Sequence, residues 1–164
     1  MTEHRNTVAT SVTGWWEYEP AEARARGFAS APTLILVHGF RGTHHGLEAV
    51  VARLPQFRVI SPDLPGFGES TPMAGEQTLD AYAGWLRQFV DLVDPAGRAI
   101  VLGHSFGSLI VARNVRALGD RRIVLVNPIS SPALEGPAKI GTFLAIAYYL
   151  SLIHISEPTR LLSI

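Results

Sequence analysis

The chain has 164 residues, of which 47% are hydrophobic and 17% charged, and its formal net charge at pH 7 is zero. This composition is typical of a globular protein and argues against disorder. The balanced charge predicts no binding to nucleic acid or acidic membranes, and the lack of cysteine excludes disulfides and thiol chemistry. No apolar signal segment begins the chain, and the apolar stretch 140–153 is too short to span a bilayer, so we expect a cytoplasmic protein.

The N-terminal third predicts strands more than helices. Residues 1–11 show no pattern and are expected to be frayed, whereas 12–18 can form an early antiparallel strand. Residues 19–31 are rich in Ala, Arg and Glu and are expected to form a turn. The run at 33–37 is almost wholly apolar, which is typical of a strand buried on both faces.

Two helices and one strand are expected next. A helix near 44–54 would have Thr43 as its N-cap, and a strand follows at 57–61. A second helix spans about 79–93, with Thr78 as its N-cap. Its inner face should carry six apolar residues, which are Leu79, Tyr82, Ala83, Leu86, Val90 and Val93.

The next strand, at 99–102, leads straight into a third helix, and a last strand follows at 123–126. This alternation of strands and helices predicts an α/β fold with a mostly parallel sheet covered by helices on both faces. The third helix should have Gly119 as its C-cap. Its apolar positions are Leu109, Ala112, Val115 and Leu118.

The junction at 103–107 reads Gly-His-Ser-Phe-Gly, which is a Gly-x-Ser-x-Gly motif between a strand and a helix. This spacing holds a serine on a sharp strand-to-helix turn. Gly103 and Gly107 flank Ser105 at two residues on either side, where a side chain would collide with its neighbour across the bend. We therefore expect the hydroxyl of Ser105 to project from the end of the sheet rather than to lie in an ordinary junction.

Two further segments strengthen this interpretation. The strand run at 34–37 ends in His-Gly-Phe-Arg-Gly at 38–42, and the segment 59–70 is a strand followed by a turn rich in Gly and Pro. Together with 103–107, in this order and at these intervals, they resemble the α/β-hydrolase family over roughly residues 30–130. The resemblance implies a lid-bearing serine hydrolase, of which this chain is the N-terminal part, truncated before the last strands of the sheet.

The resemblance also implies roles for three residues. Ser105 would be the nucleophile, and the backbone N–H groups of Phe40 and Phe106 would form the oxyanion hole. The rings of the two phenylalanines could either floor an apolar acyl pocket or pack in the core. The residues themselves do not decide between these two alternatives.

Other polar residues near these motifs are expected to be structural. His38 and His104 each end a strand beside a glycine, and we expect packed, hydrogen-bonded side chains. By resemblance, Asp63 opens a structural turn. A metal site on His38, His44 and His45 is rejected because no cysteine and no supporting spacing of Asp or Glu accompanies them. The sequence analysis therefore predicts no metal and no cofactor.

The rest of a catalytic triad is expected to be absent. The family's order requires an acid and then a histidine after Ser105. The candidate acids are Asp120, Glu135 and Glu157, and the only later histidine is His154. Asp120 lies at the far end of the helix that leaves the serine, and no strand run precedes His154. We therefore expect neither the acid nor the histidine of the triad in this chain.

The C-terminal segment 150–160 reads LSLIHISEPTR, which is one translation of a common sequencing-library adapter. The alternative is a genuine lid helix closed by a turn at 157–159. On the adapter interpretation, 1–131 is the N-terminal part of the hydrolase core, 132–149 begins a lid, and 150–164 is a non-native tail. A genomic read across the locus decides between the two.

We therefore expect a serine hydrolase that forms an acyl-enzyme on Ser105 with an ester or related carbonyl substrate. Its partner would be a small molecule with an apolar acyl part, and the oligomeric state is left open. Without the acid and the histidine, the chain as given should be inactive, and its strand at 123–126 should be an open apolar edge. The alternative is a non-catalytic protein of the same fold that binds a small ligand.

Overall fold

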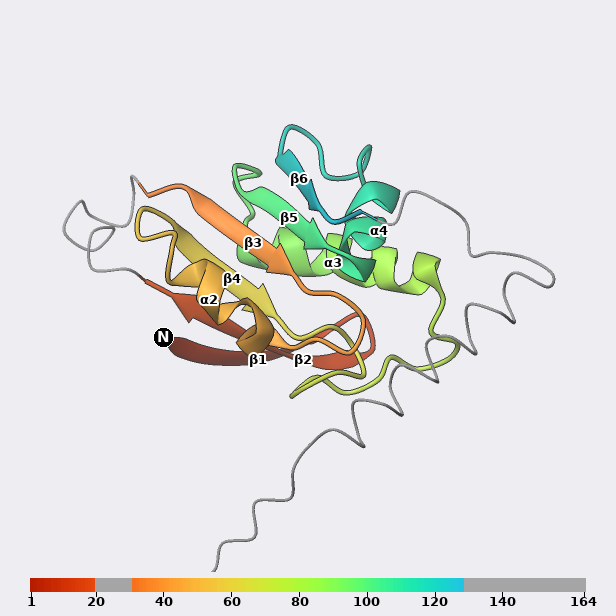
Figure 1. Cartoon of the computed structure of the whole chain (residues 1–164). Coiled ribbons are helices and arrows are strands. Elements are labelled where there is room, and N and C mark those ends of the chain that lie inside the picture. The colour runs from red at the N-terminus through yellow and green to blue at the C-terminus, as the bar shows by residue number, and fades with distance from the viewer. Residues whose placement is uncertain (20–30, 129–164) are drawn as a thin grey trace, which may run out of the picture. The chain divides into compact units, whose positions relative to one another are not determined.

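The computed structural model describes residues 1–19 and 31–128, which lie within one unit, Met1–Ile129 (Figure 1). The expected turn at 19–31, apart from its ends, and the expected lid and tail fall outside the described residues. The elements in chain order are β1 (Thr2–Val8), β2 (Ser11–Tyr18), β3 (Thr33–Val37), η2 (His44–Leu47), α2 (Glu48–Val51), β4 (Arg58–Pro62), α3 (Leu79–Val93), β5 (Ile100–His104), α4 (Phe106–Arg113) and β6 (Arg122–Val126).

Six strands form one sheet in the order β1-β2-β4-β3-β5-β6. β3 pairs in parallel with β4 and with β5, and β5 pairs in parallel with β6. β2 joins this parallel set antiparallel to β4, and β1 pairs antiparallel with β2. The α/β fold with a mostly parallel sheet is therefore confirmed, as is the early antiparallel strand near 12–18.

Apolar side chains on the two faces of the sheet build two cores. Along β3, Ile35 and Val37 pack in the core that includes α3 and α4, whereas Leu34 and Leu36 pack with Leu47 of η2. Successive side chains of a strand point to opposite faces, so a strand that is apolar throughout fills both cores. Figure 1 shows α3 and α4 on one face of the sheet and α2 on the other, as expected for helices on both faces.

Helix α3 matches its prediction closely. It runs from Leu79 to Val93, and the side chain of Thr78 accepts a hydrogen bond from the N–H of Ala81 at 3.1 Å, which confirms the N-cap. The inner face includes Trp85 and Phe89, both fully buried, which the sequence analysis did not select. Leu79 was assigned to that face wrongly, because it is 38% exposed at the start of the first turn.

Three other expectations about the elements were wrong. Residues 2–8 are not frayed but form β1, which pairs with β2 along its whole length. The helix expected at 44–54 is a 3-10 turn followed by a single α-helical turn that ends at Val51. The last helix ends at Arg113, because the Asn114 side chain donates hydrogen bonds to the backbone oxygens of Ala83 and Ile110.

The buried face of that last helix also differs from the predicted stripe. Ile110 and Val111 are fully buried, whereas Ala112 is exposed and Val115 is 55% exposed. Leu118 is buried as expected, but from the turns that follow the helix. The stripe was wrong because it assumed a helix that continues to Gly119, and the shorter helix shifts the face that meets the sheet.

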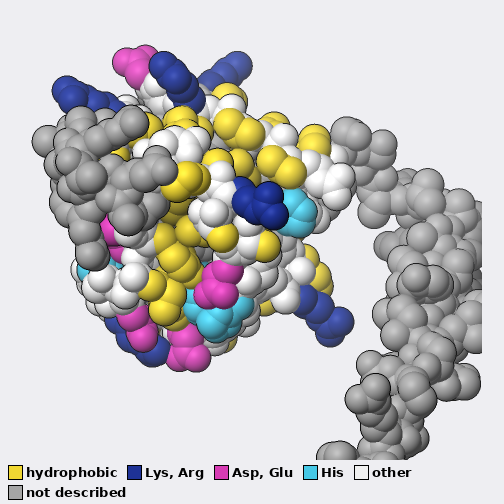
Figure 2. All heavy atoms as spheres, turned by 60° about the vertical axis from the view of Figure 1, so that its left-hand side comes forward, with side chains coloured by type: hydrophobic (Ala, Val, Ile, Leu, Met, Phe, Trp, Pro, Cys, Tyr) yellow, Lys and Arg dark blue, Asp and Glu magenta, His cyan; other side chains and the backbone are white. Residues whose placement is uncertain are grey.

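β6 is an edge strand of the sheet within the part of the chain that the structure describes. Val124, Leu125 and Val126 are each about two-fifths exposed, so the edge is apolar, as expected. Figure 2 shows hydrophobic side chains gathered across one face of the described unit, with most charged side chains toward its edges. None of the helices in the described ranges is long and apolar enough to cross a membrane.

Candidate active site

The candidate site lies at the carboxyl ends of the central strands. The chain leaves β3 toward β4 on one side and leaves β5 toward β6 on the other, and such a divergence opens a crevice at the strand ends. A cavity of about 440 Å³ occupies this position. Its lining comes from the loop after β3, the end of β5, the segment 43–50 and the end of β6, and comprises His38, Gly39, Phe40, Gly42, Thr43, Gly46, Leu47, Val50, His104, Ser105 and Val126.

Ser105 is held in an uncommon backbone conformation, with φ of 51° and ψ of −115°. Non-glycine residues rarely adopt positive φ, and such strain persists only where the surroundings enforce it. Here the N–H of Ser105 donates to the backbone oxygen of Val126 at 3.0 Å. The backbone oxygen of Ser105 accepts hydrogen bonds from both the N–H and the hydroxyl of Ser108, at 2.9 and 2.5 Å.

The two glycines beside the serine are required by backbone contacts. A Cβ atom on Gly103 would lie 2.5 Å from the backbone oxygen of Gly107. A Cβ atom on Gly107 would lie 2.6 Å from the backbone oxygen of His38 and closer still to that of Val37. Both sets of atoms are backbone and cannot move aside. The sharp turn expected at 103–107 is therefore confirmed.

The N–H groups of Phe40 and Phe106 lie on the two loops that flank the serine. Phe106 is the first residue of α4, where an N–H has no acceptor within the helix. Phe40 follows Gly39, and a Cβ atom on Gly39 would lie 3.2 Å from the Cβ of Ser105. Neither N–H donates a hydrogen bond to another group within residues 1–19 and 31–128. Both are therefore free to bind an oxygen.

The two phenylalanine rings have different surroundings. The ring of Phe40 is a wall of the cavity, and the residue is 66% exposed in the described part of the chain. The ring of Phe106 packs against the core and makes an edge contact with Tyr82 at a centroid distance of 5.4 Å. The two rings also meet edge to face, at 6.0 Å. Among the described residues, the ring of Phe40 therefore lines the cavity, whereas the ring of Phe106 packs against the core.

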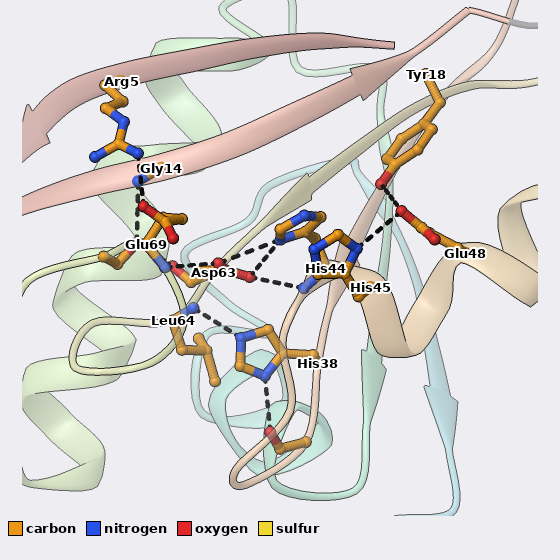
Figure 3. A network of polar contacts seen from close by, with 12 residues as sticks. Arg5, Gly14, Tyr18, His38, His44, His45, Glu48, Asp63, Leu64 and Glu69 are labelled. Atoms are coloured by element: carbon orange, nitrogen blue, oxygen red, sulfur yellow. Dashed lines mark hydrogen bonds and ion pairs between the residues drawn. The ribbon is translucent and has the colours of Figure 1, made fainter. Parts of the chain in front are cut away.

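His38 is a packed and fully hydrogen-bonded residue, as expected. Its Nδ1 lies 2.7 Å from the backbone oxygen of Gly39, and its Nε2 accepts from the N–H of Leu64 at 2.8 Å (Figure 3). A carbonyl oxygen only accepts, so Nδ1 carries the proton and the ring is neutral. Burial lowers the pKa of His38 below its ordinary value of 6.5, against the smaller opposing effect of the Gly39 oxygen. His38 therefore braces the loop and has no free nitrogen for catalysis.

Asp63 is a structural carboxylate, which confirms its expected role. It is fully buried, and its Oδ2 accepts from the N–H of Glu69 at 2.9 Å, across the turn that follows β4. Its Oδ1 accepts from the N–H of His44 at 2.6 Å. Asp63 thus caps the turn at His44, which explains why the Thr43 side chain makes no capping hydrogen bond there. A distant carboxylate replaces the local cap that the sequence suggested.

His44 was not recognised as part of this network by the sequence analysis. Its Nδ1 lies 3.1 and 3.2 Å from the two oxygens of Asp63 (Figure 3). The indole ring of Trp16 stacks on the ring of His44. No local pattern points to this pairing, because 19 residues separate the two. The contact ties the loop after β3 to the end of β4.

No histidine or carboxylate is hydrogen-bonded to the hydroxyl of Ser105 within the described residues. His104 was expected to be packed and hydrogen-bonded, but this was wrong, because it lines the cavity, is only half-buried and makes no hydrogen bond from its ring to any described residue. The later candidates Glu135, His154 and Glu157 fall outside the described ranges. Within the described residues, the structure thus shows the serine turn and the N–H groups of Phe40 and Phe106 without an acid or base hydrogen-bonded to the serine.

Comparison with known proteins agrees with this geometry. A family model described as the alpha/beta hydrolase fold matches residues 32–147. The chain is 34% identical over 108 residues to the pimeloyl-[acyl-carrier protein] methyl ester esterase of Aeromonas hydrophila, covering 64% of this chain and 40% of that protein. It is also 34% identical over 110 residues to lipase LipV of Mycobacterium tuberculosis, covering 65% of this chain and 41% of the lipase.

Solved structures show the same fold at lower identity. A putative lipase from Acinetobacter baumannii superimposes with a TM-score of 0.66 at 23% identity, over 96% of this chain and 50% of the lipase. A haloalkane dehalogenase from Bradyrhizobium elkani gives a TM-score of 0.70 at 16% identity, over 87% of this chain and 49% of the dehalogenase. The chain thus spans half or less of the length of each of these proteins. The chain belongs to the alpha/beta hydrolase fold family.

Proposed function

We propose that this chain is the N-terminal part of a serine hydrolase that acts on an ester or a related carbonyl compound through an acyl-enzyme on Ser105. The observation that carries the proposal is the strained turn that holds Ser105, with φ of 51°, at the edge of the 440 Å³ cavity. A strained backbone conformation at the mouth of a pocket is a frequent feature of functional sites. A helix can begin without a positive φ at its N-cap residue.

In the proposed reaction, the Oγ of Ser105 attacks the carbonyl carbon of the substrate. Its proton passes through a base to the leaving alcohol, and water then releases the acid from the enzyme. The negative charge that develops on the carbonyl oxygen would be bound by the N–H groups of Phe40 and Phe106. Each such donor contributes about 2.7–4 kcal/mol to transition-state stabilisation in comparable enzymes. The reaction needs no cofactor.

The cavity favours a substrate with an apolar acyl part. Its walls include the side chains of Phe40, Leu47, Val50 and Val126, and none of the described residues that line it is an Asp, Glu, Lys or Arg. Burying apolar surface against such walls contributes about 25 cal/mol per Å². A charged acyl group would lose its hydration without gaining a partner. The printed names of two relatives, a methyl ester esterase and a lipase, are consistent with an ester.

The test compares the 164-residue chain with the protein encoded at the genomic locus, which is called the genomic protein below. A fluorophosphonate probe should label the genomic protein, and Ser105→Ala should abolish the labelling. Ser61→Ala is the matched control, since the Ser61 hydroxyl makes no hydrogen bond to the described residues and does not line the cavity, so the variant should keep the label. With p-nitrophenyl acetate, the 164-residue chain should show no turnover above its own Ser105→Ala variant, because the acid and base are expected elsewhere.

Two outcomes would overturn the proposal. A genomic protein that folds, keeps its cavity and leaves Ser105 unlabelled would instead be a ligand-binding member of the fold. Labelling that survives Ser105→Ala would place the nucleophile at another residue. Turnover by the 164-residue chain that depends on Ser105 would show that a base is already present in it.

A further inference from the structure

Three side chains of types that can bind a metal ion lie together where η2 joins α2. A ring nitrogen of His44, a ring nitrogen of His45 and a carboxylate oxygen of Glu48 all lie within 4.8 Å of one another. His45 and Glu48 are three residues apart at the join of η2 and α2, and His45 Nδ1 lies 3.1 Å from Glu48 Oε1. Two ligands of one tetrahedral zinc ion are separated by about 3.3 Å, so this pair already has the required spacing.

The side chains of His44 and Glu48 are each oriented by a hydrogen bond to a further residue. For His44 this residue is Asp63. Asp63 is fully buried and lies 3.1 Å from the Nδ1 of His44. A carboxylate only accepts, so Nδ1 carries the proton and the lone pair is left on the Nε2 of His44. A carboxylate that holds the N–H of a histidine is the usual outer partner of a metal-binding imidazole, because it fixes the ring and raises its basicity.

Tyr18 orients the carboxylate of Glu48 in the same way. Its hydroxyl donates to Glu48 Oε1 at 3.4 Å (Figure 3). The side chains that could bind an ion therefore sit in a polar framework built by β2 and the turn after β4.

Two of the three side chains are accessible to solvent. A surface cleft of about 390 Å³ is lined by His44 and His45. Its lining also includes Met1, Arg5, Glu3, Asp63 and Glu69, and Arg5 forms ion pairs with both Glu3 and Glu69. The side chain of His45 is 69% exposed and that of Glu48 46% exposed, so water can complete the coordination.

From these contacts we propose that His44, His45 and Glu48 bind a divalent cation of the borderline class, Zn²⁺ or Co²⁺, with water as the fourth ligand. Two imidazoles and one carboxylate are the donors that such ions prefer. From the sequence, a site on His38, His44 and His45 was not expected, because no cysteine and no supporting spacing of Asp or Glu accompanies them. His38 is in fact fully hydrogen-bonded elsewhere, and the fold supplies Glu48 and Asp63.

The bound ion would clamp the segment 44–48 and so stabilise the loop that leads from the candidate oxyanion residue Phe40. The site does not use Ser105, so it is independent of the proposed hydrolase activity. The Ser105→Ala variant should bind the metal as the unmodified chain does. The metal-site proposal would therefore remain valid if the hydrolase proposal were wrong. The hydrolase proposal would likewise remain valid if no metal were bound.

The experiment titrates Zn²⁺ into the chelator-treated 164-residue chain and follows the heat of binding and the thermal midpoint. We expect one ion per chain and a rise in the midpoint. His45→Gln and Glu48→Gln should each weaken binding by about tenfold or more and remove the rise. These two variants are preferred to changes at His44, because both side chains are largely exposed and their loss leaves the buried Asp63 pair intact.

His4→Gln is the matched control, since His4 also faces a glutamate, with Nε2 3.3 Å from Glu17, but belongs to no cluster of three ligands. It should bind Zn²⁺ as the unmodified chain does. Co²⁺ should give a visible absorption band that His45→Gln abolishes. The proposal is overturned if no saturable binding occurs in chain shown to be folded by circular dichroism, or if His45→Gln and Glu48→Gln retain the full affinity.

Discussion

A Cβ atom placed on Gly107 would lie 2.6 Å from the backbone oxygen of His38, so the first turn of α4 meets the end of β3 backbone to backbone. This contact brings the loop that carries Phe40 against the turn that carries Ser105. Real Cβ atoms essentially never lie within 3.0 Å of a heavy atom in a residue that is not their neighbour along the chain. The approach is possible only because residue 107 has no side chain.

We expect Gly107→Ala to lower the free energy of unfolding by about 2 kcal/mol or more, because rigid backbone must shift to make room. Gly84→Ala is the matched control. Gly84 lies within α3 and a Cβ there would meet nothing within 4 Å, so the variant should gain about 0.5–1 kcal/mol. Urea denaturation of both variants measures the difference. Equal stability of the two would contradict the close approach of α4 to β3.

Ser105→Gly should be more stable than Ser105→Ala by about 1 kcal/mol. Both variants remove the hydroxyl, but glycine adopts φ near +51° without the strain that a Cβ atom imposes. Thermal unfolding of the two variants side by side measures this strain directly. If Ser105→Ala proved the more stable of the two, the turn would not be strained.

The stability of the protein should fall between pH 7 and pH 5.5, in part because of His38. Burial lowers the pKa of His38 below 6.5, so below that pH the unfolded chain binds a proton that the folded chain excludes. Stability is therefore lost as the pH falls from 6.5 toward the folded pKa, by at most about 1.4 kcal/mol per pH unit.

His38→Gln should be less stable at pH 7 but should lose less stability on acidification. Glutamine can still donate to Gly39 and accept from Leu64, and it does not titrate. His4→Gln, at a more exposed site, serves as the control. An unchanged pH slope in His38→Gln would show that another group dominates acid unfolding.

The buried ion pair between Arg121 and Asp94 should contribute strongly to stability. Their side chains are each 9% exposed, and Arg121 Nε donates to Asp94 Oδ2 at 2.9 Å. The same carboxylate accepts from the N–H of Ala99 at the start of the segment that enters β5. Removal of one partner from a buried pair leaves the other charge without compensation, so Arg121→Ala should cost about 3 kcal/mol.

The exposed pair between Arg113 and Asp80 provides the matched control for that ion pair. Its N–O distance is 2.7 Å, but both side chains are more than half exposed. Solvent screens such a pair, so Arg113→Ala should leave the unfolding midpoint in urea nearly unchanged. A similar loss in Arg113→Ala and Arg121→Ala would contradict the importance of burial.

Phe40 should influence the choice of acyl group in the genomic protein. It is the largest apolar wall of the cavity, so Phe40→Ala should lower kcat/KM for p-nitrophenyl hexanoate about tenfold more than for the acetate. Leu92→Ala removes another exposed hydrophobic side chain, which does not line this cavity. This control should leave kcat/KM unchanged for both the hexanoate and the acetate. An unchanged preference in Phe40→Ala would place the acyl group elsewhere.

The strands of the parallel sheet, helix α3 with its Thr78 cap and the serine turn at 103–107 could all be predicted from the amino-acid sequence. These features depend on patterns within a few residues: apolar runs, a 3.6-residue period, and glycines where a side chain would collide. Local physics is sufficient for them, and the structure agrees. The family resemblance, carried by three such motifs, was reliable for the same reason.

The tertiary structure alone decided the features that join distant residues. Asp63 caps the turn at His44 in place of Thr43, Asn114 ends α4, and β1 forms because β2 offers it a partner. In each case the decisive hydrogen bond comes from another part of the chain, and no local pattern records which residue will be near. The grouping of His44, His45 and Glu48 before the buried Asp63 became visible only once the strands had brought their ends together.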